Sequence, residues 1–268
     1  MKETIGSISE SPSLSPTQLR SEPHTVSAGR GLKWLTEGWA LLRKEPLMFI
    51  AMSVISLIGI FIINLIPLLG SLATVLFWPA LAAGFFLAFK HAQQDQPVSV
   101  NDLFEPFKTP GSLIGVGGMY LLASIVIMLF MFIIAFIGFG SFSAIVSGDI
   151  DMERMTRGFI IITLVSIPVS LAFVMAFAFA PVLVHQHNVP VIEAIKRSFS
   201  GSLRNIRPFI VFFAVLTLCF ILLSAFVVVP LIGLLISMAM AVLYLPLFCG
   251  ALFCAYRDIF LQPSNPEL

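Results

Sequence analysis

The sequence predicts an all-α polytopic membrane helix bundle with about six transmembrane helices. Of its 268 residues, 58% are hydrophobic and 11% are charged, and the mean hydropathy is +1.01. A soluble domain has about 45–50% apolar and about 25% charged residues. Long uncharged runs and three short amphipathic segments support the same class, since a bilayer covers the first and its surface suits the second.

Two of the apolar runs are too long for a single membrane crossing. The run 47–89 contains no charged residue, and as one helix it would be about 65 Å long, roughly twice the thickness of a bilayer core. Pro67 and Gly70 predict a reversal, because proline interrupts a helix and glycine permits a tight turn. The spans are then 47–66 and 69–89. Pro230 and Gly233 divide the last run in the same way, into 209–229 and 232–255.

Two more apolar runs, 113–138 and 158–184, lie between these pairs and are separated by the polar stretch 148–154. They bring the number of predicted spans to six. Four further prolines lie inside predicted spans and are candidate helix breaks. They are Pro79, Pro168, Pro181 and Pro246.

The basic residues near the span ends predict that both termini are cytoplasmic. Cytoplasmic loops collect Lys and Arg, and with the N-terminus inside only Arg154 and Arg157 face outward. The cytoplasmic ends then carry Arg30, Lys33, Arg43, Lys44, Lys90, Lys108, Lys196, Arg197, Arg204, Arg207 and Arg257. The opposite orientation would reverse this ratio.

Three segments have an amphipathic pattern and are expected to lie flat on the cytoplasmic face. The first, 31–44, has Leu32, Leu35, Trp39 and Leu42 on one side and Lys33, Glu37 and Lys44 on the other. Its two tryptophans suit the headgroup zone. The second begins at Ser99, with Asp102 at the capping-box position. The third, 192–207, carries an apolar stripe formed by Ile192, Ile195, Phe199, Leu203 and Ile206.

The composition predicts three regions and an internal repeat. Residues 1–28 are rich in Ser and Pro and are expected to form a disordered cytoplasmic tail. The region 29–260 is the transmembrane domain, and 261–268 is a short cytoplasmic tail. Within the domain, an amphipathic segment, a proline and two spans recur in the first and last thirds, and more loosely in the middle. This pattern indicates parallel two-span repeats.

The side chains within the spans favour neither catalysis nor cofactor binding. No charge is placed at a span centre, and no nucleophile and base form a pair. Cys219, Cys249 and Cys254 lie in apolar runs as packing residues. His185 and His187 are two residues apart, on nearly opposite sides of a helix. We therefore expect no enzyme activity, no cofactor and no metal site.

One basic cluster is a candidate contact for anionic lipid headgroups, since each such charge near a negative leaflet contributes about 1 kcal/mol. Non-specific anchoring to the bilayer explains the cluster equally well. It consists of Lys196, Arg197, Arg204 and Arg207. Nothing indicates nucleic-acid binding, and the sequence does not predict a protein partner or a homo-oligomer.

Two motifs carry a resemblance to a known family. They are Gly29-Arg30-Gly31-Leu32-Lys33-Trp34 with Gly38-Trp39, and Tyr256-Arg257-Asp258-Ile259-Phe260. Together with the proline before the first span, they resemble a family of uncharacterised proteobacterial membrane proteins over residues 28–260. The architecture is also similar to the membrane domain of some glycerophosphodiester phosphodiesterases. The resemblance implies six spans in a bacterial inner membrane, and no substrate.

Two functions remain open from the sequence. The first is a non-enzymatic membrane module, a scaffold, accessory or lipid-organising protein, which predicts a closed bundle without a polar cavity. The second is a small permease or lipid-handling transporter, in which the proline-broken spans line a cavity at the membrane midplane. An intramembrane enzyme ranks third.

Overall fold

The computed structural model describes residues 18–108, 110–139, 152–224 and 230–262. These residues form helices, and the only β-type pairing among them is an isolated bridge between Leu19 and Leu261. The helices are α1 (Arg30–Leu42), α2 (Pro46–Asn64), α3 (Leu69–Gln93), α4 (Asn101–Lys108), α5 (Pro110–Phe139), α7 (Met152–Phe177), α8 (Ala180–His187), α9 (Val191–Arg204), α10 (Ile206–Ser224) and α11 (Pro230–Phe260).

Six stretches of the described chain are long and apolar enough to cross a membrane, which confirms the predicted all-α polytopic bundle. Their mean hydropathy lies between 2.0 and 2.9. The stretches are Pro46–Asn64, Leu69–Gln93, Leu113–Phe139, Met155–His187, Ile206–Ser224 and Leu235–Phe260. Each coincides with one predicted span.

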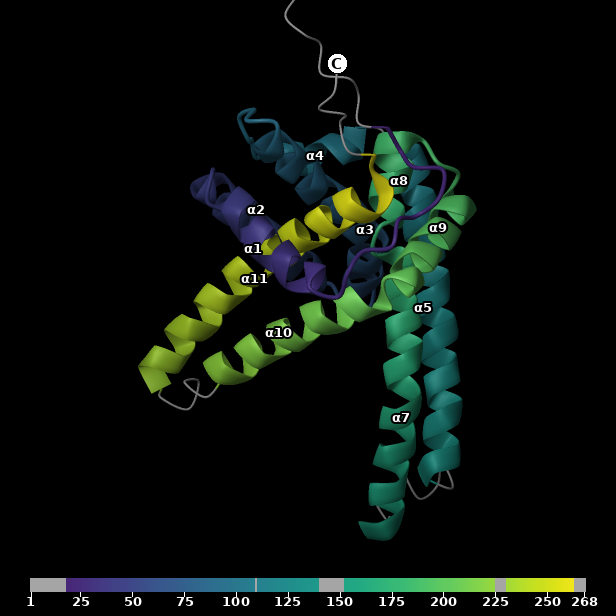
Figure 1. Ribbon diagram of the computed structural model, residues 1–268. Helices are drawn as coiled ribbons and strands as arrows, with labels where there is room; N and C mark the ends of the chain where they lie inside the picture. Colours follow the sequence, from purple (N-terminus) through teal and green to yellow (C-terminus); the bar gives the residue numbers. More distant parts are fainter. Residues whose placement is uncertain (1–17, 109, 140–151, 225–229, 263–268) are drawn as a thin grey trace, which may run out of the picture.

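The helices form three hairpins that diverge from one end of the molecule (Figure 1). The hairpins are α2–α3, α5–α7 and α10–α11, and we call the end where they meet the platform. It consists of α1, α4, α8 and α9 with the adjoining ends of α3 and α11. The largest buried side chains, among them Trp34, Phe89 and Tyr256, lie there. The far ends expose large apolar residues such as Ile62 and Leu222, as expected of lipid-facing surface.

The three two-span units interlock in a closed ring at the platform. Helix α4 packs against α3, and α9 packs against α7, which in each case is the second span of the hairpin before it in the chain. Helix α1 packs against α11, the second span of the last hairpin, and this contact closes the ring. Glycine permits two of these contacts. A Cβ atom on Gly84 of α3 would lie 2.7 Å from the carbonyl oxygen of Leu103 in α4, and Gly250 of α11 lies against the carbonyl oxygen of Gly38 in α1.

The predicted reversal at Pro67 is confirmed, but Gly70 does not make the turn. Helix α2 ends at Asn64 and α3 begins at Leu69. The residue with positive φ is Leu68, at 64°. Gly70 is helical, and a Cβ there would lie 2.1 Å from the carbonyl oxygen of Ile63. Glycine is therefore needed for the close approach of α2 and α3.

The other candidate breaks divide into two groups. Pro181 follows a true interruption, since α7 ends at Phe177 and α8 begins at Ala180. Pro79, Pro168 and Pro246 lie inside continuous helices, so the predicted breaks at these three positions are wrong. A proline removes one backbone hydrogen bond, and membrane helices tolerate this loss where neighbouring helices pack closely.

Helix α10 ends at Ser224 and α11 begins at Pro230, and residues 225–229 between them lie outside the described part of the chain. Pro230 is the first residue of α11, where its missing N–H group has no helical role. Gly233 lies in the first turns of the same helix and is buried. The expectation that Gly233 forms the reversal is therefore wrong.

The described part of the N-terminal segment packs against the C-terminal helix. Residues 1–17 and 263–268 lie outside the described part of the chain. Residues 18–28, expected to be disordered, instead run along the end of α11. The backbone N–H of Arg20 donates to the carbonyl of Phe260 at 2.7 Å, and that of His24 donates to Ile259 at 2.8 Å. The backbone of Gln262 donates to Gln18 at 3.0 Å, so the two predicted tails pair with each other.

Candidate functional site

Helix α1 lies between the two arms of a V formed by α10 and α11 (Figure 1). Two glycines allow this position. A Cβ on Gly31 would lie 2.1 Å from the carbonyl oxygen of Pro208 in α10, and one on Gly38 would lie 2.7 Å from the backbone nitrogen of Ala251 in α11. The backbone of α1 is thus packed against both spans, and its flat position on the bilayer surface stays a prediction.

The two tryptophans of α1 lie in different environments. Trp34, expected in the headgroup zone, is fully buried, whereas Trp39 is 41% exposed. Leu35 and Leu42 of the predicted apolar side are buried, but Leu32 is exposed. The buried face of α1 is centred on Trp34, Gly38 and Leu41.

Four charged side chains connect α1 to α11. The Arg30 guanidinium donates from Nε to Asp258 Oδ2 at 2.7 Å, and its Nη1 lies 2.9 Å from Glu37 Oε1. Arg257 pairs with the same Glu37 carboxylate. The indole N–H of Trp34 donates to Asp258 at 2.9 Å, so the carboxylate also satisfies a buried donor. We call these five residues the α1–α11 network.

The α1–α11 network unites the two motifs of the family resemblance, and their joint role was missed at the sequence level. A signal existed: Arg30, Trp34 and Glu37 are spaced i, i+4 and i+7, which places them on one helix face. That spacing puts Glu37 beside Trp34 and not on the outward polar side. Burial lowers the pKa of Arg30, but its hydrogen bond with Asp258 and the nearby carboxylates outweigh burial and raise it overall.

Helix α9 packs with its small residues and exposes its large ones. The buried positions are Ala194, Ser198, Gly201 and Ser202. Three residues of the predicted apolar stripe face outward, with Ile192 at 61%, Phe199 at 37% and Leu203 at 53% exposure, whereas Ile195 is partly buried against the core. That α9 is an interfacial helix stays a prediction, and its exposed apolar residues are free to contact lipid.

The four candidate lipid contacts divide into two pairs. Arg197 lies 2.6 Å from Glu193 on the same helix, and Arg204 lies 2.9 Å from Glu22 of the N-terminal segment. Lys196 and Arg207 are exposed, and within the described part of the chain neither has an acidic side chain in salt-bridge range. Arg207 belongs to α10, because α9 ends at Arg204.

Two serines of α9 form hydrogen bonds with the backbone at the interruption between α7 and α8, just before Pro181. The Ser198 hydroxyl accepts a hydrogen bond from the backbone N–H of Phe179 at 3.1 Å and donates to the carbonyl of Met175 at 2.8 Å. Ser202 also reaches Met175, at 3.4 Å. The backbone groups that α7 leaves unpaired therefore find partners in the protein, as an apolar environment requires.

Two histidines, one at the end of α8 and one on α3, form side-chain hydrogen bonds. His187 hydrogen-bonds the buried Tyr256 hydroxyl of α11. The second histidine, His91 on α3, lies 3.0 Å from Asp102, whose carboxylate also accepts the Ser99 backbone N–H at 3.1 Å. This last contact confirms the predicted capping box of α4.

An apolar cavity of about 130 Å³ lies where α3, α5, α7, α8 and α11 converge. Pro79 and Pro181 line it, as the second function predicts, and Pro168 and Pro246 do not. Its other lining residues include Trp78, Tyr120, Phe173 and Cys249. Its lining contains no charged residue.

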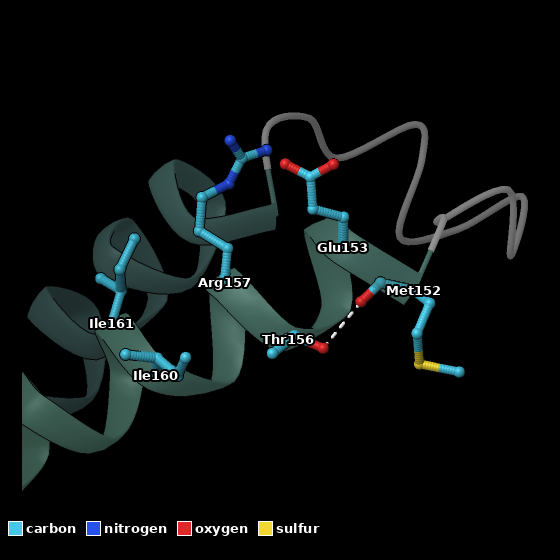
Figure 2. A pocket seen from close by; sticks show the side chains of 6 residues that line it. All are labelled: Met152, Glu153, Thr156, Arg157, Ile160 and Ile161. Carbon is cyan, nitrogen blue, oxygen red and sulfur yellow. Dashed lines mark hydrogen bonds between the residues drawn. The ribbon is translucent and has the colours of Figure 1, made fainter.

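A second, open depression of about 450 Å³ lies at the far end of α7 (Figure 2). Glu153 and Arg157 rise from the same side of the helix, and Thr156 donates to the Met152 carbonyl at 2.8 Å.

These features define a multi-pass helical membrane protein with a packed platform at one end. A probable inner membrane protein of Burkholderia thailandensis is 28% identical to this chain over 198 residues, which is 70% of this chain and 72% of the relative. No family model and no solved structure matches the chain. The similarity and the six spans together identify a multi-pass inner-membrane protein. Its orientation and its resemblance to phosphodiesterase membrane domains remain predictions.

Proposed function

We propose that the protein is a non-enzymatic membrane module that organises anionic lipid around its platform through α9. One observation carries the proposal: α9 buries its small residues and turns Ile192, Phe199 and Leu203 outward. An exposed apolar stripe of this kind is unfavourable in water, because each large side chain gains about 1.5–3 kcal/mol from full burial. The stripe is stable where acyl chains cover it.

The charges support a preference for anionic headgroups. Lys196 is exposed on α9, between the apolar stripe and the face with Glu193, and Arg207 is exposed one turn beyond the helix end. A basic side chain at the edge of an interfacial apolar stripe lies at headgroup level. Arg197 and Arg204, by contrast, already have carboxylate partners. We assign the lipid contact to Lys196 and Arg207.

The test measures lipid preference next to α9 in vesicles of neutral phosphatidylcholine. Phe199→Trp supplies a fluorescent reporter on the stripe, and brominated phosphatidylglycerol or brominated phosphatidylcholine quenches it. Phosphatidylglycerol should quench more strongly. Replacing Lys196 and Arg207 by Gln should lower its relative affinity about fivefold per charge, since each contributes about 1 kcal/mol.

The matched control replaces the paired residues Arg197 and Arg204 by Gln on the same helix. Its effect should be smaller, because the wild-type charges are already partly neutralised. Equal quenching by the two brominated lipids in the wild-type protein would leave only non-specific anchoring. Equal losses in both double variants would show that total charge matters and not the two assigned residues.

The cavity favours a second candidate, a lipid-handling transporter. Small-molecule pockets usually enclose about 300–1,000 Å³, and the cavity has only about 130 Å³. It is too small for most solutes and has no charge for ion coupling, which speaks against a solute permease. Transfer of a fluorescent lipid between the leaflets of vesicles distinguishes the candidates, because a module should not accelerate it.

A further inference from the structure

We infer that the cavity lined by Pro79 and Pro181 binds a single acyl chain of a bilayer lipid. This inference does not depend on the role proposed for α9, since the two sites lie on different parts of the fold. It specifies the chemical class of ligand for a cavity that the platform geometry creates.

The depth of the cavity is the first argument. On α3, Pro79 precedes Lys90 by about three helical turns, and on α11, Phe248 precedes Arg257 by about two and a half. At 1.5 Å per residue these separations are about 13–17 Å along the helices. Half the hydrocarbon thickness is about 15 Å. The lining also includes Phe86 and Leu252, about one turn from the two basic residues. The cavity therefore extends from near the platform into the hydrocarbon layer, where acyl chains are the surrounding medium.

The lining is the second argument. Aromatic rings from four helices surround the space, among them Trp78, Phe173 and Phe248. Buried polar ligands need partners for their hydrogen bonds and charges, and the lining side chains supply only the indole N–H of Trp78, the hydroxyl of Tyr120 and the weakly polar thiol of Cys249. An uncharged, apolar ligand matches this surface.

Size and access complete the case. An apolar cavity of about 150 Å³ can hold a benzene-sized molecule, so about 130 Å³ accommodates several methylene groups of one chain and not a whole lipid. Val174 lines the cavity and is 40% exposed on α7. Val174 therefore reaches both the cavity and the lipid-facing surface, and this is the side from which we expect a chain to enter.

The experiment uses the full protein in phosphatidylcholine vesicles with a trace of phosphatidylcholine that carries a diazirine within one acyl chain. After illumination, mass spectrometry maps the adducts. Peptides containing Trp78 and Phe173 should carry more adducts per residue than the exposed α10 surface around Leu218. The neutral headgroup makes the result independent of the anionic preference proposed for α9.

A filled cavity provides the contrast. Ala82→Phe places a ring in the space and should reduce cavity adducts about tenfold, as expected when about two methylenes lose their apolar surroundings. Leu218→Phe, on the lipid-facing side of α10, should change nothing. If Ala82→Phe does not fold, Ala178→Leu fills the same cavity from the segment before α8. Cavity adducts no denser than those on α10, or undiminished in a folded filled variant, would overturn the inference.

Discussion

Replacing Gly38 by Ala tests whether α1 is an internal packing helix. The added Cβ would lie 2.7 Å from backbone atoms of Ala251 and Gly250, whereas carbon atoms pack at about 3.5–4.0 Å. Backbone cannot rotate away, so α1 and α11 must separate by about 1 Å. That gap weakens dispersion contacts along the interface. Overpacking of this kind costs about 1–3 kcal/mol.

The protein contains its own reporter for this experiment. Cys249 and Cys254 are buried on α11, whereas Cys219 is exposed. In a Cys219→Ser background, a thiol-reactive fluorogenic dye therefore reports the opening of α11 during heating. We expect Gly38→Ala to lower the apparent melting temperature by about 2–12 °C, using about 2–4 °C per kcal/mol for a chain of comparable size.

Glycines with free space around them provide the control. A Cβ on Gly59, within α2, meets nothing within 4 Å. Because alanine is about 1 kcal/mol better than glycine inside a helix, Gly59→Ala should leave the melting temperature unchanged or raise it. If Gly38→Ala melts like Gly59→Ala, α1 does not pack against α11 at this point and the reasoning is refuted.

Three further results are expected. Asp258→Asn removes the negative charge of the α1–α11 network and should destabilise the protein by about 1–3 kcal/mol in the same dye assay, since charged hydrogen bonds are strong; an unchanged melting curve would contradict this. Ser198→Ala leaves the buried Phe179 N–H without its partner and the Met175 carbonyl with only the 3.4 Å contact to Ser202, and it should cost about 1–3 kcal/mol, whereas Ser200→Ala should be neutral. In intact cells, single cysteines at Ser147, Ser99 and Ser200 should react with an impermeant thiol reagent only at Ser147; labelling at the other two without Ser147 would reverse the predicted orientation.

The spans were predictable because hydropathy and length act locally along the chain. Each of the six runs became a membrane-length helix, and Pro67 and Pro181 mark real interruptions. Pro79 and Pro246 were misjudged, since a proline within a span breaks the helix only if nothing else supports it. Sequence alone does not show which neighbours provide that support.

The short helices illustrate the other limit. The amphipathic pattern of α9 is strong, yet it does not reveal that the small residues Ala194 and Ser198 face the protein. In α1, Trp34 and Glu37 were assigned to different environments although they share one face and one network. Amphipathicity predicts that a helix has two sides. Tertiary packing decides which partner covers each of them.

The closed ring at the platform has a consequence for biosynthesis. Helix α1 is made first, but the span that buries Trp34 and accepts Gly38 is the last to be synthesised. About 200 residues separate the two helices, and at about 5–20 residues per second their synthesis takes about 10–40 s. During that interval the face of α1 that carries Trp34 and Gly38 has no α11 to pack against. The α1–α11 network is therefore completed only when the last span has been made.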